Sequence, residues 1–393
     1  MRVLILNADY PRFLRWLYQG QPDLVTASYA TQMAARNATL FGVADFYSRN
    51  FATLGHTAAE IHVNNQHLQA AWAREHGLAV DLTVATGASR HERLPGWLQR
   101  AAAPFKPILR PLARKVGLSP RLDDSMTRIL LAQIEDFRPD MVLNQDVFHV
   151  DTALVRRIKA IGKPIMIGQV GVEPPRGVDW TVYDLMISQL PRIIEAFRAA
   201  GVRAELSYPA FEPAIIDALP PPPPKDIDVS FVGSVSVDHR QRIALLEAVA
   251  ERYQLKLWGA RPQALPASSP LHRCFQSEVW GVEMYQVLRR SRITLNSHID
   301  IAGNEAGNMR LFEATGVGTF LLTDFKDNLH TLFQPDRDVA VWRSIPDSLD
   351  KIEHYLRQDG ARDIVAQAGQ ATTLHRHTYR HRASEILEFL KVI

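Results

Sequence analysis

Strand-forming and helix-forming segments alternate along this chain, and the alternation is interrupted once, by five consecutive prolines at 220–224. Before the prolines, short apolar runs such as RVLILNA (2–8) and DMVLNQD (140–146) are separated by amphipathic stretches long enough for helices, for example 124–137. This alternation is typical of a parallel sheet with helices on both faces. Prolines cannot donate backbone hydrogen bonds and favour an extended chain, so the run predicts a spacer.

The same alternation starts again after the prolines. IDVSFVGSV (227–235), LKLWG (255–259) and RITLNSH (292–298) are predicted strands, with helical patterns between them. The fold class is therefore α/β, with two Rossmann-like doubly wound domains facing a cleft. The expected divisions are 1–219 for the N-terminal domain, 220–226 for the linker, 227–382 for the C-terminal domain and 383–393 for a final helix.

Composition limits the class of protein. A chain of 393 residues that is 46% hydrophobic and 22% charged is long enough for two hydrophobic cores of ordinary size. The apolar run at the N-terminus is too short for a signal peptide or a membrane span. The single cysteine, Cys274, excludes an internal disulfide and suits a reducing compartment. We expect a cytoplasmic protein.

Charge argues against a nucleic-acid partner and leaves one basic segment to explain. The formal net charge is +3 and the isoelectric point about 8.9, a smaller basic excess than nucleic-acid binding domains carry. Between 93 and 121, seven Lys and Arg residues are interleaved with large apolar side chains. Such a segment can lie against the anionic inner face of a membrane or bind an anionic acceptor. A solvated insertion with an apolar underside is the alternative interpretation.

The stretch NEAGNMRLFEATGVGTFLLTD (304–324) contains the candidate site. It follows a predicted strand, and a helix is expected to start near Asn308, which places Gly307 at the positive end of that helix. Backbone N–H groups at a helix N-terminus have no partner within the helix and can bind a phosphate. Glu305 lies in the loop facing that helix N-terminus, and Glu313, about two turns further on, can reach a hydroxyl pair such as a ribose. The pattern therefore indicates a sugar-nucleotide pocket.

The two glutamates resemble the E-x7-E pair of GT-B glycosyltransferases. The longer string N-x-R-L-F-E-A-x-G-x-G-x-F-L-L-T-D is similar to the C-terminal domain of the CgeB-like (spore maturation protein) family, and the resemblance extends to a closing H-T-Y-x-x-R at 377–382. It implies the GT-B fold, in which a final helix commonly crosses back to the first domain. It also implies a hexosyltransferase-like enzyme that uses a nucleoside-diphosphate sugar, needs no metal or other cofactor, and glycosylates a glycan, a lipid-linked glycan, a protein or a small molecule.

The resemblance assigns roles to individual positions of this chain. Glu313 is expected to bind the ribose and Glu305 to act near the donor sugar as a catalytic residue. Further donor contacts are expected from backbone or side-chain groups of Gly233, Ser234, Gly307, Asn308, Met309 and Arg310. A cation that neutralises the leaving diphosphate is expected at Arg242, or at Arg240 two residues earlier.

In parallel α/β sheets, ligands bind outside the carboxyl ends of the strands. This strand-end rule gives two further donor contacts and the candidate residues of the acceptor side. Asn296 and His298 come after a strand that is expected to end at the cleft, so they are candidate donor-binding residues. Tyr10 and Arg12 follow the first strand and are candidate acceptor contacts. Asp146 is the candidate base, with Asp9, at another strand end, and the loop acid Glu173 as alternatives. A reaction that retains configuration needs no such base, so both stereochemical outcomes stay open.

Two other functions are compatible with the same residues. One is a non-catalytic scaffold that binds a sugar nucleotide within a glycosylation assembly, and the other is an epimerase of the GT-B fold that acts on the nucleotide sugar itself. The D-x-D string at 226–228 directly follows the prolines and precedes a strand, so it is interpreted as a solvated strand start. No metal site is predicted.

Overall fold

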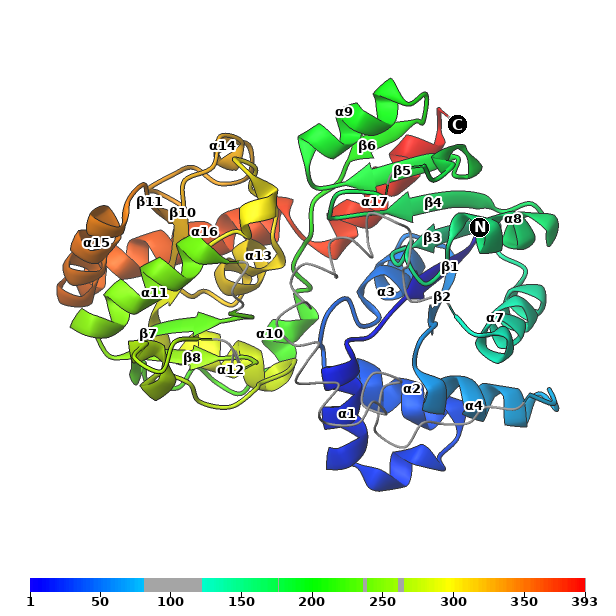
Figure 1. Ribbon diagram of the computed structural model, residues 1–393, viewed down its shortest axis with the longest axis horizontal. Helices are drawn as coiled ribbons and strands as arrows, with labels where there is room; N and C mark the ends of the chain where they lie inside the picture. The colour runs from blue at the N-terminus through cyan, green and yellow to red at the C-terminus, as the bar shows by residue number, and fades with distance from the viewer. Residues whose placement is uncertain (81–121, 176, 236–238, 261–264, 393) are drawn as a thin grey trace.

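Two parallel sheets form two domains that lie side by side (Figure 1). The computed structural model describes residues 1–80, 122–175, 177–235, 239–260 and 265–392. All strand pairs within each sheet are parallel. The predicted fold class, α/β with two Rossmann-like domains, is confirmed. The basic segment 93–121 lies outside the described residues.

The N-terminal domain is built on a six-stranded sheet in the order β2-β1-β3-β4-β5-β6. Its central strands are buried on both faces, as their runs of Val, Ile, Leu and Met require. The strands are β1 (Arg2–Asn7), β2 (Thr57–His62), β3 (Met141–Asn144), β4 (Ile165–Gln169), β5 (Leu185–Ser188) and β6 (Ala204–Leu206). The helices are α1 (Pro11–Gly20), α2 (Tyr29–Ala38), α3 (Phe46–Thr53), α4 (Gln66–Glu75), α7 (Asp124–Phe137), α8 (Thr152–Ala160), α9 (Pro191–Ala199) and α10 (Ala214–Ala218).

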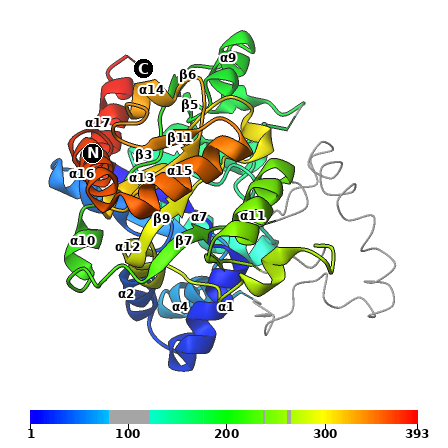
Figure 2. The ribbon, with the colours of Figure 1, turned by 90° about the vertical axis from the view of Figure 1, so that its left-hand side faces the viewer.

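The C-terminal domain is built on a five-stranded sheet in the order β11-β10-β9-β7-β8. Its strands are β7 (Ile227–Val232), β8 (Leu255–Trp258), β9 (Ser291–Leu295), β10 (Leu321–Asp324) and β11 (Ala340–Trp342). Its helices are α11 (Arg240–Arg252), α12 (Val282–Arg290), α13 (Met309–Gly316), α14 (Leu329–Leu332), α15 (Ile345–Arg357), α16 (Asp359–Arg376) and α17 (Tyr379–Leu390). In Figure 2 this domain faces the viewer, and α11 and α15 lie side by side in front of its strands.

The segment between the sheets has no helix or strand at the five prolines. Asp226 and Asp228 flank the start of β7 and pair with Arg290 and Arg292, in keeping with their interpretation as strand-start residues. No described helix is long and apolar enough to cross a membrane.

One hydrophobic cluster joins the two domains. It contains Val3 and Ile5 of β1 together with Leu321 of β10 and Val341 of β11. Helix α17 lies in this cluster, because it crosses from the C-terminal domain and packs on α3 of the N-terminal domain (Figure 1). A second cluster belongs almost entirely to the N-terminal domain and a third to the C-terminal domain.

The closing H-T-Y-x-x-R string forms the start of this crossing. The ring of Tyr379 is buried and contacts Phe46 and Tyr47 of α3, with ring centroids 5.1 and 5.0 Å apart. Arg382 donates from its Nε to the carbonyl of Tyr208 at 2.9 Å and from its Nη2 to His377 Nδ1 at 2.9 Å. These side chains attach the C-terminal helix to the segment that leads out of the N-terminal domain.

His377 at this crossing makes stability depend on pH. Its ring is buried, and Nε2 donates to the carbonyl of Leu332 at 2.9 Å. Burial lowers the pKa of His377 from 6.5 to about 4; the hydrogen bond to Leu332 opposes this shift and the charge of Arg382 adds to it. The folded protein therefore keeps this ring neutral where the unfolded chain protonates it.

We expect the free energy of unfolding to fall as the pH is lowered from 6.5 to about 4. In that range the unfolded chain binds a proton at His377 that the folded chain does not, so acid favours unfolding; the contribution of the neutral ring is complete above pH 6.5. The slope is at most about 1.4 kcal/mol per pH unit. Urea unfolding of the wild type and of His377→Gln across this range measures it. The difference in stability should shrink toward low pH, and parallel curves would contradict the assignment.

Candidate functional site

Side chains that follow the strands of the C-terminal sheet converge at its carboxyl edge. Asn296, directly after β9, exchanges amide hydrogen bonds with Asn308, the residue before α13, at 2.7 and 3.2 Å. Asn296 also donates to the hydroxyl of Thr323 on β10 at 2.9 Å. The structure thus joins two predicted donor-binding residues and fixes the start of α13 against the sheet.

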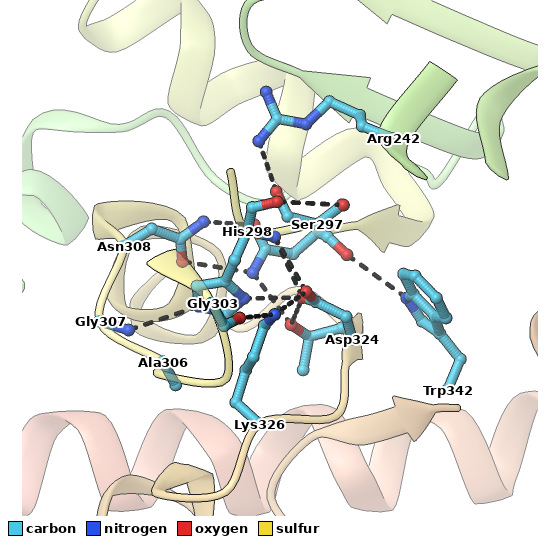
Figure 3. Close-up of polar contacts among 12 residues, drawn as sticks. Arg242, Ser297, His298, Gly303, Ala306, Gly307, Asn308, Asp324, Lys326 and Trp342 are labelled. Carbon is cyan, nitrogen blue, oxygen red and sulfur yellow. Dashed lines mark hydrogen bonds and ion pairs between the residues drawn. The ribbon is translucent and has the colours of Figure 1, made fainter. Parts of the chain in front are cut away.

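His298 lies at the centre of this edge (Figure 3). Its Nδ1 is 2.7 Å from Oδ1 of Asp324, the last residue of β10, and its backbone N–H donates to the same carboxylate. Its Nε2 accepts from the backbone N–H of Gly307 at 3.4 Å. Since Nε2 is the acceptor, the proton resides on Nδ1 and is donated to Asp324. The Gly307 N–H that the sequence suggested as a phosphate donor is directed at His298 in this structure.

Asp324 and Lys326 belong to the same cluster and were not predicted from the sequence. Lys326 Nζ lies 3.3 Å from Asp324 Oδ2 and donates to the carbonyl of Gly303 at 2.6 Å (Figure 3). Burial acts to raise the pKa of Asp324, but the interaction with His298, which includes two hydrogen bonds, and then the charge of Lys326 outweigh it, so the pKa lies below its ordinary value. The strand-end rule that selected His298 also applies to TFLLTD and would have selected Asp324.

Arg242 fixes two loops of the site. Its guanidinium is buried and donates to the carbonyls of Ser234, after β7, at 2.8 Å and of Ser297, after β9, at 2.5 Å. Burial lowers the pKa of Arg242 to about 10, against the attraction of Asp324 and Asp300. Arg240 is exposed, and its backbone N–H donates to Asp300 at 3.2 Å. Of the two candidate cations, only Arg242 therefore points into the cluster.

The loop after β7 is pressed against the loop after β8. Gly233 donates its N–H to the carbonyl of Trp258 at 2.9 Å. A Cβ at Gly259, which has a φ of +142°, would lie 2.2 Å from the carbonyl oxygen of Gly233, so this position requires glycine. The backbones of Gly233 and Ser234 are thus held from two sides.

Glu305 lies in the loop before α13 and turns toward the N-terminal domain. Its Oε1 accepts from the backbone N–H of Arg192 in α9 at 2.9 Å, and its Oε2 is 3.4 Å from Arg192 Nε. The two residues line a pocket of about 490 Å³ together with Asn304, Asn328 and His330. The first glutamate of the pair is therefore at the boundary between the domains.

Glu313 lies inside the C-terminal domain, on α13. Only 6% of the residue is exposed, and its Oε2 is 3.0 Å from Arg310 Nη1, one turn earlier. Arg310 also contacts the sulfur of Met284 at 3.4 Å. The same helix packs against the N-terminal domain, since a Cβ at Gly316 would lie 2.3 Å from the ring of Phe211. Met309 is the first residue of α13 and is half-buried.

The candidate residues of the N-terminal domain are less closely gathered. Tyr10 is 66% exposed, and Arg12 forms an ion pair with Glu278 of the other domain. The Asp146 carboxylate contacts the ring of His149 and accepts from the backbone N–H groups of residues 148 and 149 at 3.3 Å. Asp9 is buried in an ion pair with Arg36 at 2.6 Å. Asp146 and Asp9 are thus held by their own domain, whereas Arg12 bridges the two domains.

No group of three or more His, Cys, Asp or Glu side chains that could hold a metal ion occurs among the described residues.

Comparison with known proteins finds a family similarity within the C-terminal domain and the same fold in solved structures. Residues 240–388 match the family described as Glycosyl transferase-like. No curated protein sequence matches the chain.

Three solved structures share the fold over almost the whole chain. A glycosyltransferase from Rickettsia africae is 10% identical, with a TM-score of 0.58 over 99% of this chain and 97% of that one. Sucrose-phosphate synthase from Thermosynechococcus elongatus is 9% identical, with a TM-score of 0.57 over 100% and 98%. HepE from Anabaena, in complex with UDP-glucose, is 11% identical, with a TM-score of 0.56 over 100% of both chains. The predicted GT-B fold is confirmed.

Proposed function

We propose that this chain is a glycosyltransferase that transfers a hexose from a nucleoside-diphosphate sugar to an acceptor, without a metal, and that it belongs to the CgeB-like division. The glycosyltransferase-like C-terminal domain and the GT-B fold support the reaction class. UDP-glucose, which HepE binds, is the first donor to test.

The placement of the two glutamates around the start of α13 carries the proposal. Glu313 is buried on the helix beside Arg310, where a carboxylate can accept hydrogen bonds from a ribose. Glu305 lies in the preceding loop at the domain boundary, where a donor sugar would meet an acceptor. The ion pair with Arg310 gives a structural reason for a charged side chain at position 313. Packing, however, does not require a carboxylate at both 305 and 313.

The surrounding cations suit departure of a diphosphate. When the bond from the anomeric carbon to the diphosphate breaks, its electron pair goes to the leaving oxygen, and negative charge grows there. Arg242, Lys326 and the N-terminus of α13 supply positive charge at the carboxyl edge of the sheet. Fixed cations of this kind serve the role that a metal serves in other transferases.

The acceptor is proposed to enter from the N-terminal domain near Tyr10, whose ring contacts Phe41 with centroids 6.0 Å apart. The exposed phenol offers both a stacking surface and a hydroxyl. Arg12, by its pairing with Glu278, is proposed to join the domains around that acceptor rather than to bind it alone.

The donor site is tested by binding. Replacing Glu313 with Ala is expected to weaken donor binding by about 1 to 3 kcal/mol, because a hydrogen bond to a charged group is lost. Calorimetry with UDP-, GDP-, dTDP- and CMP-sugars, in the presence of a chelator, measures the loss and identifies the base. The control is Glu353→Ala, which removes a half-exposed glutamate of the same domain.

The outcomes separate the candidate functions. Donor binding that Glu313→Ala weakens and Glu353→Ala leaves unchanged supports the site. Binding without turnover, with or without acceptors, would favour the scaffold, and isomerisation of the sugar without an acceptor would favour the epimerase. Donor binding that occurs only when a metal is present would refute the proposal that transfer needs no metal.

A further inference from the structure

The carboxylate of Glu305 is held by the opposite domain. The backbone N–H of Arg192 donates to Oε1 at 2.9 Å, and Arg192 Nε is 3.4 Å from Oε2. Arg192 is the second residue of α9, where backbone N–H groups have no partner within the helix and the helix dipole is positive. The contact therefore combines a helix N-terminus with a guanidinium.

The main chain around Glu305 is fixed by its own domain instead. The backbone N–H of Glu305 donates to the carbonyl of Ala302 at 3.2 Å, and that of Ala306 donates to Asn328 Oδ1 at 2.6 Å. Lys326 holds the carbonyl of Gly303. The 302–307 loop is thus anchored to the C-terminal domain through its backbone. The N-terminal domain sets the direction of the Glu305 carboxylate.

Arg192 is itself held in place by the N-terminal domain. Its Nη1 lies 2.5 Å from Glu173, on the loop after β4. Two further contacts join the domains near Arg192. A Cβ at Gly307 would lie 2.9 Å from the side chain of Gln189, so these two segments approach closely. Ala302 packs in the hydrophobic cluster of the N-terminal domain. The turn at 189–192 and the loop at 302–307 therefore meet along several residues, and Arg192 is part of that contact.

Glu305 and Glu313 differ in which domain holds their carboxylates. Glu313 is paired with Arg310 of its own helix, so its position does not depend on the other domain. Glu305 is paired across the boundary. Any separation of the domains would release Glu305 and leave Glu313 in place.

Resting on the function proposed above, we propose that Arg192 is the positioning residue of Glu305. The first glutamate takes its working orientation only while the 189–192 turn contacts the 302–307 loop. Donor recognition then belongs to the C-terminal domain alone, and turnover requires both domains together. This arrangement prevents Glu305 from acting on a donor in the open protein, where water has access to it.

The test separates turnover from binding. Arg192→Ala removes the guanidinium and keeps the backbone N–H, and it is expected to lower kcat by about 10- to 100-fold, since small errors in position have effects of that size. The donor Kd should stay within about twofold, because the C-terminal domain is unchanged. Arg192→Lys should recover part of kcat. Release of the nucleoside diphosphate from UDP-glucose, or from the donor that the calorimetry selects, measures turnover.

Arg198→Ala is the matched control. Arg198 lies on the same helix and pairs with Glu205 within its own domain, with about half of its side chain exposed, so its loss should change kcat by less than about twofold. Equal kcat values for Arg192→Ala and Arg198→Ala would overturn the inference, as would a loss of activity that appears only at subsaturating donor, through a higher donor Kd, and disappears at saturation. A wild type without turnover on any donor would instead defeat the proposed function.

A second measurement does not depend on turnover. In the wild type the Arg192 N–H is protected by Glu305, so Glu305→Ala should speed hydrogen exchange at residue 192. Unchanged exchange there would show that the domains are not joined through this pair in solution, and the inference would fall.

Discussion

Glu305→Gln is expected to lower turnover by about 100- to 1000-fold, the effect found when one preorganised charged or polar group is removed from a transition state. The amide keeps the shape of the side chain and can still accept from the Arg192 N–H, so the loop should keep its conformation. What is lost is a negative charge near the sugar, which becomes positively charged as the diphosphate leaves. The KM for the donor should change little.

The same assay of diphosphate release tests this prediction. Glu195→Gln is the control, because Glu195 is an exposed residue of α9, the helix that carries Arg192, and the substitution removes a carboxylate without touching Glu305. Turnover of Glu305→Gln above about a tenth of the wild type would show that the charge is not used in the rate-limiting step.

Local patterns in the sequence were enough for the fold. The run RVLILNA gave β1, and 124–137 coincides with α7, because a strand buried on both faces must be continuously apolar and an amphipathic helix must repeat every three or four residues. The predicted helix start near Asn308 is also the observed one. These features depend only on neighbours along the chain.

Part of the candidate site could be predicted because it follows strand ends. Asn296 and His298 could be selected by that rule, and the structure joins them to Asn308 and Gly307. Asp324, the last residue of β10, obeys the same rule but was not predicted. The partner of Glu305 gives no local signal, because Arg192 is 113 positions away and becomes a neighbour only when the domains meet.

Arg12, in the N-terminal domain, is a second residue whose partner could not be predicted from the sequence. Its position after β1 suggested an acceptor contact, yet its ion pair is with Glu278, 266 positions away. Both contacts join one domain to the other, and the pattern of a single domain contains no information about them. Residues at the boundary of a GT-B cleft are therefore the ones for which the structure adds most.

Tyr379→Ala is expected to lower the free energy of unfolding by about 3 to 5 kcal/mol, because a large buried ring is removed and a cavity remains. The ring contacts Phe46 and Tyr47 across the boundary and lies in the hydrophobic cluster shared by the two domains. Each domain also has a cluster of its own, which the substitution does not touch. We therefore expect the wild type to unfold in one urea transition and the variant in two.

Tyr379→Phe separates the ring from its hydroxyl. The ring accounts for the packing on α3, so this variant should lose less than about 1 kcal/mol and keep a single transition. A Tyr379→Ala protein that still unfolds in one transition would mean that the domains are coupled elsewhere, most directly through the 189–192 turn and the 302–307 loop. In that case combining Tyr379→Ala with Arg192→Ala should separate the transitions, since the two contacts lie on different elements and act independently.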